Sequence, residues 1–343
     1  MKTAVKIKDI AAQLGLSRNT VSKALNGQYV PKKTKEKVIR KAQEMNYKSF
    51  NNAIPKSKKY RILLLSGKPF HNMNFFVPLV KSIENYCYDN NYDFFEYTYN
   101  SAKTSFETIK NYIRSIEADG IIAIECFEES LIDKLLALKM PISFIDFCGH
   151  TFEPNNRKFD LINSTDQKSI SDFTKTLITR NNFKNFTYIG DYHHCLSFHE
   201  RYVGMLRGIV RSGLDHNREN DILEDDATFD YGDTVLLGEK IKKLKVFPDC
   251  IICSNDFIAR RTIIALNQLG YDVPKDVAVV GFDGVSESIN FTPRITTFVV
   301  NKEFIGEETI RLLVSRINNK NCPTRIVAVE VDLMELDSTN KTI

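Results

Sequence analysis

The sequence contains no apolar stretch long enough to cross a membrane, and its first 60 residues are too polar and too basic for a secretory signal. It also lacks a glycine-rich phosphate loop, a G-x-S-x-G nucleophile elbow and an H-E-x-x-H zinc motif. These absences predict a cytoplasmic protein with no membrane partner and no catalytic apparatus. We therefore expect neither an enzyme nor a bound cofactor.

The seven cysteines do not form a regularly spaced framework, and their number is odd. Reduced thiols are the natural interpretation. Cys250 and Cys253 have the spacing of a zinc-binding pair, but no second pair of ligands is spaced to complete a tetrahedral site. His193, His194 and His199 likewise have no carboxylate or thiol at regular spacing. The sequence thus predicts no metal site.

Charge is unevenly distributed along the chain. Residues 1–60 contain 15 lysines and arginines against three acidic residues, a net charge of +12. The whole chain carries +4, which leaves −8 for residues 61–343. This asymmetry indicates a polyanionic partner for the basic end alone. A solvated basic tail is the alternative, but such a tail would not show helical apolar spacing.

The segment 5–45 has the spacing of a helix-turn-helix. Ala11 is small enough for a second helix to cross nearby, and Gly15 can adopt the left-handed backbone of the turn. Ser17 is a suitable N-cap for the helix that follows. Apolar residues at helical spacing predict one small core for three helices: Ile10, Ala11 and Leu14; Val21, Ala24 and Leu25; Val38, Ala42 and Met45.

The second of these helices presents a donor-rich outer face. Arg18, Asn19, Ser22 and Lys23 remain on that face once the apolar positions point inward. Such a helix fits the major groove of DNA, where base edges offer a distinct pattern of acceptors and donors. The basic end therefore predicts a head that binds double-stranded DNA.

From Tyr60 onward, short apolar runs alternate with amphipathic stretches. We expect strands at 61–66, 92–97, 120–125, 142–147, 186–190, 250–254, 277–282 and 326–333. We expect helices near 75–90, 103–117, 129–139, 166–180, 199–212, 231–244, 256–268 and 302–319.

Strands of nearly continuous Ile, Val and Leu that alternate with helices indicate parallel sheets covered on both faces. The number of βα units exceeds one open sheet, so we expect two doubly wound α/β subdomains. Ligands of such sheets bind beyond the carboxyl ends of the strands. The residues to inspect at these ends are Asp146, Phe147, Asn255, Asp256 and Asp283.

Several short motifs recur along the chain in a defined order. The head contains KDIAAQLGLSRNTVSKALNG, and the body contains NFF (74–76), FID (144–146), HERYVGM (199–205), CSNDFIA (253–259), VAVVGFDG (277–284) and LDST (336–339). In these motifs and their order the chain resembles the LacI/GalR family of bacterial transcription regulators over nearly its whole length, and the head motif is highly specific. The resemblance implies a periplasmic-binding-protein-like body with two lobes and an effector in the cleft. It also implies a homodimer that reads a near-palindromic operator.

The resemblance also implies domains and site residues. The expected domains are a helix-turn-helix head at 1–48, a hinge at 49–59 and an effector-binding and dimerisation body at 60–343. Base edges would be met by Arg18, Asn19 and Lys23, and phosphates by Ser17, Thr20, Ser22 and Asn26. The expected effector contacts are Phe76, Asp146, Phe147, Arg201, Asn255 and Asp283.

Two departures from the family pattern stand out. Pro55 disfavours helix at Ile54, so the usual hinge helix is in question. The usual leucine wedge has no obvious counterpart in this chain, and Ile54 is no more than a candidate for it. Asn163 stands where the family usually has an acidic residue after the strand near 160. The effector specificity is therefore expected to be unusual.

These observations predict a sequence-specific repressor controlled by a sugar or a sugar derivative. Carboxylates accept hydrogen bonds from adjacent hydroxyls, an arginine donates two parallel bonds, and a phenylalanine can stack on a sugar ring. The alternative within regulation is a repressor that responds to a nucleobase. An extracytoplasmic sugar-binding protein and a carbohydrate-active enzyme are rivals from other classes. The basic head argues against the first, and the missing catalytic motifs argue against the second.

Overall fold

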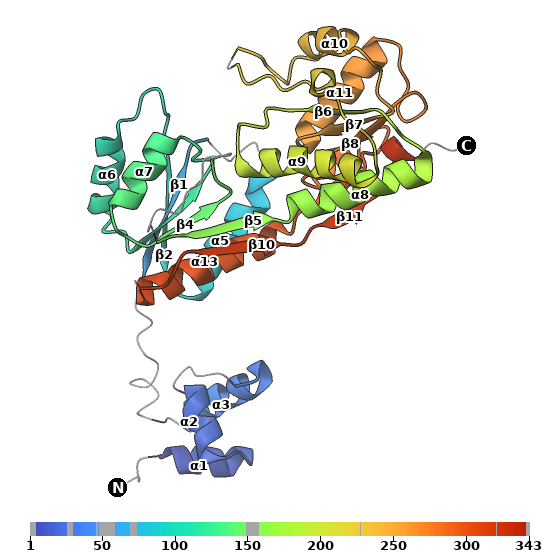
Figure 1. Ribbon diagram of the computed structural model, residues 1–343. Coiled ribbons are helices and arrows are strands. Elements are labelled where there is room, and N and C mark those ends of the chain that lie inside the picture. The colour runs from blue at the N-terminus through green and yellow to red at the C-terminus, as the bar shows by residue number, and fades with distance from the viewer. Residues whose placement is uncertain are drawn as a thin grey trace. The chain divides into compact units, whose positions relative to one another are not determined.

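The computed structural model describes residues 5–25, 30–45, 47, 59–68, 74–148, 158–226, 228–319 and 321–340 (Figure 1). It divides into two compact units. Unit 1 comprises residues 1–60 with 90–93, and unit 2 comprises residues 61–89 with 94–343. Of the expected hinge 49–59, only Lys59 is described, so Ile54 and Pro55 lie outside the described residues. The domain boundaries proposed from the sequence stay a prediction.

Unit 1 contains the three helices α1 (Ile7–Leu14), α2 (Arg18–Leu25) and α3 (Lys32–Glu44). Gly15 ends α1 with φ +63°, the left-handed conformation that its position in the motif predicted. The Ser17 hydroxyl accepts a hydrogen bond from the Thr20 amide at 3.0 Å and so caps α2 as expected. Both local predictions for the turn are confirmed.

The core of unit 1 is formed by the residues that helical spacing selected. Ile10, Val21, Val38 and Ala42 have no exposed surface, and Leu14 and Met45 pack against this cluster while remaining partly exposed. The helices are therefore held by a small apolar centre, which leaves their polar faces free for a partner.

The first lobe of unit 2 is built on a six-stranded sheet in the order β10-β5-β4-β3-β1-β2. The register that the structure gives for this sheet is parallel throughout. Its strands are β1 (Arg61–Ser66), β2 (Asp93–Thr98), β3 (Gly120–Ile124), β4 (Ile142–Ile145), β5 (Asp160–Ser164) and β10 (Arg325–Val329). Its helices are α5 (Phe76–Asp89), α6 (Phe106–Ser115), α7 (Glu129–Ala137) and α13 (Lys302–Asn318).

Both faces of this sheet are covered. Leu63, Ile121 and Phe144 belong to an apolar cluster that also contains buried residues of α6 and α7. On β3, Gly120 approaches Leu313 of α13, and α13 in turn packs along α5. This double cover explains why the strands read as nearly continuous apolar runs.

The second lobe has a parallel sheet in the order β6-β7-β8 and a two-stranded antiparallel pair, β11-β9. Its strands are β6 (Phe186–Ile189), β7 (Cys250–Cys253), β8 (Ala278–Val280), β9 (Thr297–Val299) and β11 (Asp332–Met334). Its helices are α8 (Asp166–Asn181), α9 (Leu196–Arg211), α10 (Thr234–Lys242), α11 (Asp256–Gln268) and α12 (Ser286–Ile289), with short 3-10 turns η1 (Arg218–Asn220) and η2 (Asp337–Thr339).

The chain passes between the two lobes three times. It leaves the first sheet after β5 and enters α8, it returns from β9 to α13, and it crosses again between β10 and β11. Helices α8 and α9 pack along each other, and Figure 1 shows them side by side. The two α/β subdomains expected from the sequence are present, joined by three crossings.

Three strands differ from expectation. The predicted strand 326–333 is two strands, β10 in the first lobe and β11 in the second, because the chain crosses between lobes at residues 330–331. β9 was not among the expected strands, and β5 was expected only from the family resemblance, as a strand near 160. β5 reads DLINS, and its polar Asp160 is buried only because Arg316 and Arg325 both bind its carboxylate, at 2.6 and 2.7 Å.

The cysteines behave as expected for thiols. None of the seven, all of them described, forms a disulfide, and Cys250 and Cys253 are fully buried in β7. Among the described residues there is no group of three or more side chains placed to hold a metal ion. No helix within the same residues is both long enough and apolar enough to cross a membrane.

The close contact between α8 and α9 gives a test of the fold. A Cβ atom at Gly208 would lie 2.6 Å from the Thr174 Cβ and 2.7 Å from the Ser171 carbonyl oxygen. We expect Gly208→Ala to lower the free energy of unfolding by about 1–3 kcal/mol, because the two helices must separate. Urea denaturation measures this change.

Gly238 of α10 is the matched control, since its Cβ would meet nothing closer than 3.9 Å. Gly238→Ala should leave stability unchanged or raise it by up to about 1 kcal/mol through helix propensity. Equal losses for the two variants would contradict the packing that the structure shows.

Candidate functional site

The outer face of α2 carries the side chains that the sequence assigned to DNA. Arg18, Asn19 and Lys23 are exposed, whereas Thr20 and Ser22 are half-buried. All five lie on one helix of eight residues. Ser17 is exposed and caps this helix, and Asn26 lies outside the described residues.

Helix α3 adds positive charge to the same unit. Lys33, Lys35, Lys37 and Arg40 are exposed along it. Its acidic partners near the end are few: Glu44 binds Lys41 at 2.6 Å and Arg40 at 3.9 Å. Unit 1 therefore combines a polar, donor-rich helix with an excess of exposed ammonium and guanidinium groups, the combination that a DNA backbone and its base edges require.

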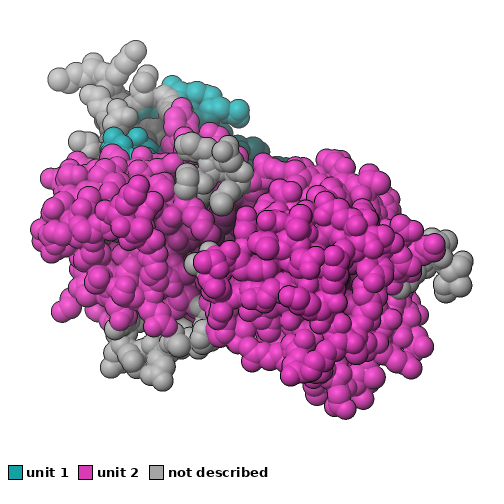
Figure 2. Space-filling model, turned by 90° about the horizontal axis from the view of Figure 1, so that it is seen from above, with its two compact units in different colours: residues 1–60, 90–93 teal, residues 61–89, 94–343 magenta. Residues whose placement is uncertain are grey.

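A cavity in unit 2 has a volume of about 650 Å³ and is lined by residues of both lobes. Figure 2 shows unit 2 in magenta as two masses with a furrow between them. The first lobe contributes residues at the ends of β3, β4 and β5 and at the start of α5. The second lobe contributes residues that follow β6, β7 and β8. The cavity thus lies where ligands of parallel sheets bind.

Three carboxylates at this edge have an unusual backbone. Glu125, Asp146 and Asp283 follow β3, β4 and β8 and have φ values of +53°, +60° and +117°. Residues other than glycine rarely adopt such angles, and each instance costs of order 1–3 kcal/mol. The fold therefore holds these three carboxylates in their orientation at a cost in stability.

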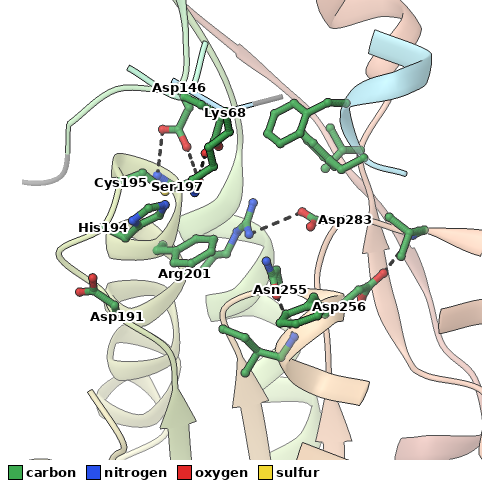
Figure 3. Close-up of a pocket in the computed structure, with 18 of the residues that line it drawn as sticks. Lys68, Asp146, Asp191, His194, Cys195, Ser197, Arg201, Asn255, Asp256 and Asp283 are labelled. Carbon is green, nitrogen blue, oxygen red and sulfur yellow. Dashed lines mark hydrogen bonds and ion pairs between the residues drawn. The ribbon is translucent and has the colours of Figure 1, made fainter. Parts of the chain in front are cut away.

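The carboxylate of Asp146 accepts hydrogen bonds from within the protein. One carboxylate oxygen accepts hydrogen bonds from the amides of Phe147 (2.7 Å) and Ser197 (3.2 Å), and the other accepts from the Ser197 hydroxyl at 2.5 Å. Ser197 lies in the first turn of α9, so a carboxylate of the first lobe caps a helix of the second (Figure 3). Asp146 lines the cavity as expected, but it also ties the lobes together.

Arg201 of α9 lies at the floor of the cavity with only 4% of its side chain exposed. Its guanidinium donates to Asp166 at 2.8 Å and to the Ser254 carbonyl oxygen at 2.5 Å, and it lies 3.6 Å from the Asp283 carboxylate. It also stacks 3.8 Å from the ring centroid of Phe282. Figure 3 shows the side chain directed toward Asp283.

Burial and charge shift the pKa values in this group. Burial raises the pKa of Asp283 to about 8, and Arg201 opposes that shift. Burial also raises the pKa of Asp166, which is fully buried beside the same guanidinium. For Arg201 itself burial would lower the pKa, but Asp166 and Asp283 hold it above its ordinary value. Arg201 is therefore charged at neutral pH, and its carboxylates compete for one cation.

Aromatic side chains form the apolar walls. Phe75 and Phe76 come from the start of α5, and Phe198, Phe229 and Phe257 come from the second lobe. Phe147, which we expected in the cleft, lies instead in the core of the first lobe. It is 2% exposed and stacks on Phe159 with ring centroids 5.7 Å apart. Since Phe147 follows Asp146 directly, the two side chains point in different directions, and only Asp146 faces the cavity.

Two asparagines complete the polar lining. Asn255 follows β7 and caps α11, because its side-chain oxygen accepts from the Ile258 amide at 2.9 Å. Asn163 lies on β5, and its side-chain nitrogen is buried with no hydrogen-bond partner among the described residues. A buried donor without an acceptor costs free energy, so a ligand acceptor at this point would be favourable.

The structure also places residues here that the sequence did not select. Lys68, Glu125 and Asp191 line the cavity and follow strands β1, β3 and β6, so the rule of strand ends could have found them. His194 also lines it, and burial lowers the pKa of its imidazole. Asp166 also follows a strand end, that of β5, by two residues, but β5 was not among the strands expected from the apolar runs. Asp166 begins α8 and reaches the site through its contact with Arg201.

Comparison with known proteins agrees with this architecture. A family model described as bacterial regulatory proteins, lacI family, matches residues 6–49, and a periplasmic binding protein-like domain matches residues 175–339. The HTH-type transcriptional repressor PurR of Vibrio parahaemolyticus is 27% identical over 340 residues, 98% of each chain. PurR of Vibrio cholerae is 29% identical over 350 residues, 97% of each chain.

Solved structures of the same fold cover the chain almost completely. A complex of the transcriptional regulator CelR with cellobiose has a TM-score of 0.72 at 20% identity and covers 97% of this chain and 99% of its own. The lac repressor dimer bound to operator and the anti-inducer ONPF has a TM-score of 0.67 at 17% identity and covers 98% and 99%.

A helix-turn-helix head on a two-lobed α/β body defines a DNA-binding transcriptional regulator whose body binds small molecules. The chain belongs to the LacI family of bacterial regulatory proteins and is a transcriptional repressor. Like the relatives named above, which are transcriptional repressors, it is a regulator and not an enzyme.

The raised pKa of Asp283 predicts a pH dependence of stability. An unfolded aspartate ionises near pH 4, whereas the folded chain holds this proton up to roughly pH 8. Between these values the folded state binds more protons, so the free energy of unfolding falls as pH rises. Asp283→Asn removes this contribution.

The melting temperature of the wild type should therefore fall relative to that of Asp283→Asn as pH is raised from roughly 5 to 8. Asp89→Asn, an exposed carboxylate at the end of α5, is the control and should follow the wild type. Parallel profiles for wild type and Asp283→Asn would show that Asp283 is ionised throughout this range.

Proposed function

We propose that this repressor reads its operator through α2. Its affinity for the operator rises or falls when a small nucleobase-like effector occupies the cavity between the lobes. The observation that carries the proposal is the pairing of an exposed donor-rich helix with a built cavity in one chain. The effector must bind one lobe arrangement better than the other, since a ligand with equal affinity for both would shift nothing.

For the DNA head, we assign base contacts to Arg18, Asn19 and Lys23. Asn19 and Lys23 are one helical turn apart, so they share a face, and Arg18 begins the helix beside it. Ser17, Thr20, Ser22 and Asn26 are assigned to phosphates and to positioning of the helix. A near-palindromic operator and a homodimer follow from the family, whose lac repressor is described as a dimer on operator.

For the effector, the names of the relatives favour a nucleobase over a sugar, and the lining of the cavity is compatible with one. The relatives that match the whole chain carry the name PurR, which points to a purine. The cavity also has aromatic rings on both lobes, Phe76 from one and Phe198 and Phe257 from the other. A flat heterocycle can stack on such rings while Asn163 and Asp283 meet its edge.

A sugar is the second candidate. The CelR structure of the same fold holds cellobiose, and the cavity here offers Asp283 and Arg201 in the arrangement that suits adjacent hydroxyls. Calorimetric titration with hypoxanthine, guanine, ribose and cellobiose separates the two. Saturable binding of a purine alone supports the proposal, and binding of a sugar alone overturns its effector assignment.

The DNA assignment can be tested without knowing the operator in advance. Selection from random duplexes yields a preferred site, against which Arg18→Ala should lose about 1–3 kcal/mol of binding free energy while its affinity for random DNA hardly changes. Lys37→Ala should weaken both kinds of DNA to a similar extent, because a phosphate contact carries no sequence information. Gel-shift titration measures both affinities, and equal losses on both DNAs for Arg18→Ala would contradict base reading.

The effector assignment is best tested away from Arg201, because removal of Arg201 would leave the buried carboxylate of Asp166 without its cation. Phe76→Ala removes one apolar wall and should weaken binding of the effector about tenfold to a hundredfold. Val77→Ala, on the adjacent exposed position of α5, should bind normally. Operator binding without effector should survive in both variants. An unchanged effector affinity in Phe76→Ala would show that the ligand binds elsewhere.

A further inference from the structure

Two buried donor atoms in the lining of the cavity have no acceptor. The side-chain nitrogen Nδ2 of Asn163 and the Nε of Arg260 are buried, and neither has a hydrogen-bond partner within the described ranges. No buried side-chain acceptor of the lining lacks a partner in the same part of the chain. The hydrogen-bonding capacity that the protein leaves unmet around the cavity is therefore that of donors, and a ligand acceptor would satisfy it.

The orientation of the Asn163 side-chain amide is fixed by the backbone beside it. Its oxygen Oδ1 accepts a hydrogen bond from the Ser164 amide at 2.9 Å. A rotation of the side-chain amide by a half-turn would bring its NH2 group against that N–H, so the oxygen stays where it is. The group that Asn163 has left for a ligand is thus the NH2 group, which donates hydrogen bonds and accepts none.

The other polar groups at the floor of the cavity do not impose the same requirement. Burial raises the pKa of Asp283 to about 8, so its carboxyl is largely protonated at neutral pH. That carboxyl can donate to a ligand, or lose its proton and accept from one. Arg201 can only donate, but its guanidinium is already bound to Asp166 and to the Ser254 carbonyl oxygen. Asp283 therefore suits a ligand edge of either polarity, whereas Asn163 suits only one.

We propose that Asn163 is a specificity-determining residue of this cavity, whose NH2 group donates a hydrogen bond to an acceptor atom of the effector. A base with an oxo group at this point is bound. A base with an amino group there binds weakly, because two donors would face each other and neither would be paired. The LacI family usually has an acidic residue at this position, so this chain offers a donor where an acceptor is usual. The inference rests on the proposed function, in which the cavity is the effector site.

The test compares hypoxanthine with adenine, which share the purine ring and differ in an oxo against an amino group at the same carbon. Binding of each base to the full chain is measured by calorimetry at neutral pH, up to about 1 mM of ligand. Hypoxanthine should bind about tenfold more tightly than adenine, the ratio expected when one buried donor is left unpaired. Equal affinities, or tighter binding of adenine, overturn the proposal.

Asn163→Asp reverses the polarity of the side chain and keeps its shape. The carboxylate can still accept from the Ser164 amide, but it has no proton to donate. Because the family usually has an acidic residue here, the fold should accept this change, and circular dichroism checks that it does. Hypoxanthine should bind about tenfold more weakly to this variant, whereas adenine should bind at least as tightly as to the wild type. An unchanged ratio of the two affinities overturns the proposal.

Two further variants separate the donor from the charge. Asn85→Asp makes the same substitution at an exposed position of α5 outside the lining and should leave both affinities unchanged. If it shifts their ratio as Asn163→Asp does, the net charge of the protein is responsible and the proposal is wrong. Asn163→Ala removes the donor without adding charge, so hypoxanthine should lose its advantage over adenine in this variant as well. A retained tenfold preference for hypoxanthine would contradict the role of Asn163.

Failure of this inference can be told apart from failure of the proposed function. If hypoxanthine binds the wild type and weakens with Phe76→Ala, but the Asn163 variants leave its ratio to adenine unchanged, the effector site stands and the role of Asn163 is wrong. If neither base binds, or if Phe76→Ala changes the affinity of neither, the effector assignment itself is wrong and the role of Asn163 falls with it.

Discussion

The buried charge of Arg201 is the constraint on which the effector-binding body depends. A guanidinium with 4% of its side chain exposed must be neutralised and fully hydrogen-bonded, or the second lobe would not be stable. Its partners come from the start of α8, from the end of β7 and from the turn after β8. One cation therefore holds together three segments that are distant in sequence, and the floor of the cavity is where they meet.

Asp146 performs a related task between the lobes. Its carboxylate caps α9, the helix that carries Arg201, so the end of β4 in the first lobe is linked to the floor of the cavity in the second. The chain itself crosses between the lobes three times nearby. A ligand in the cavity would contact groups whose internal hydrogen bonds span both lobes, and such contacts would let it favour one lobe arrangement.

The two units differ in how far the sequence predicts them. In unit 1, helical spacing alone identified the buried residues Ile10, Val21 and Val38, and local chemistry identified the turn at Gly15 and the cap at Ser17. These features depend on contacts within a few turns of helix, so the order of residues specifies them. In unit 2, runs such as RILLLS and GIIAI indicated the strands, because strands covered on both faces are apolar throughout.

The sequence by itself determined the small helical core, the alternation of strands and helices, and the strand ends at which Asp146, Asn255 and Asp283 face the cavity. Only the tertiary structure decided which neighbours those residues meet. It buried Phe147 in the first lobe while Asp146 faced the cavity, made a strand of DLINS by pairing Asp160 with two arginines, and divided 326–333 between two sheets. The physical reason is that a charged or polar residue is stable in the interior only with partners from distant segments, and spacing along the chain carries no record of them.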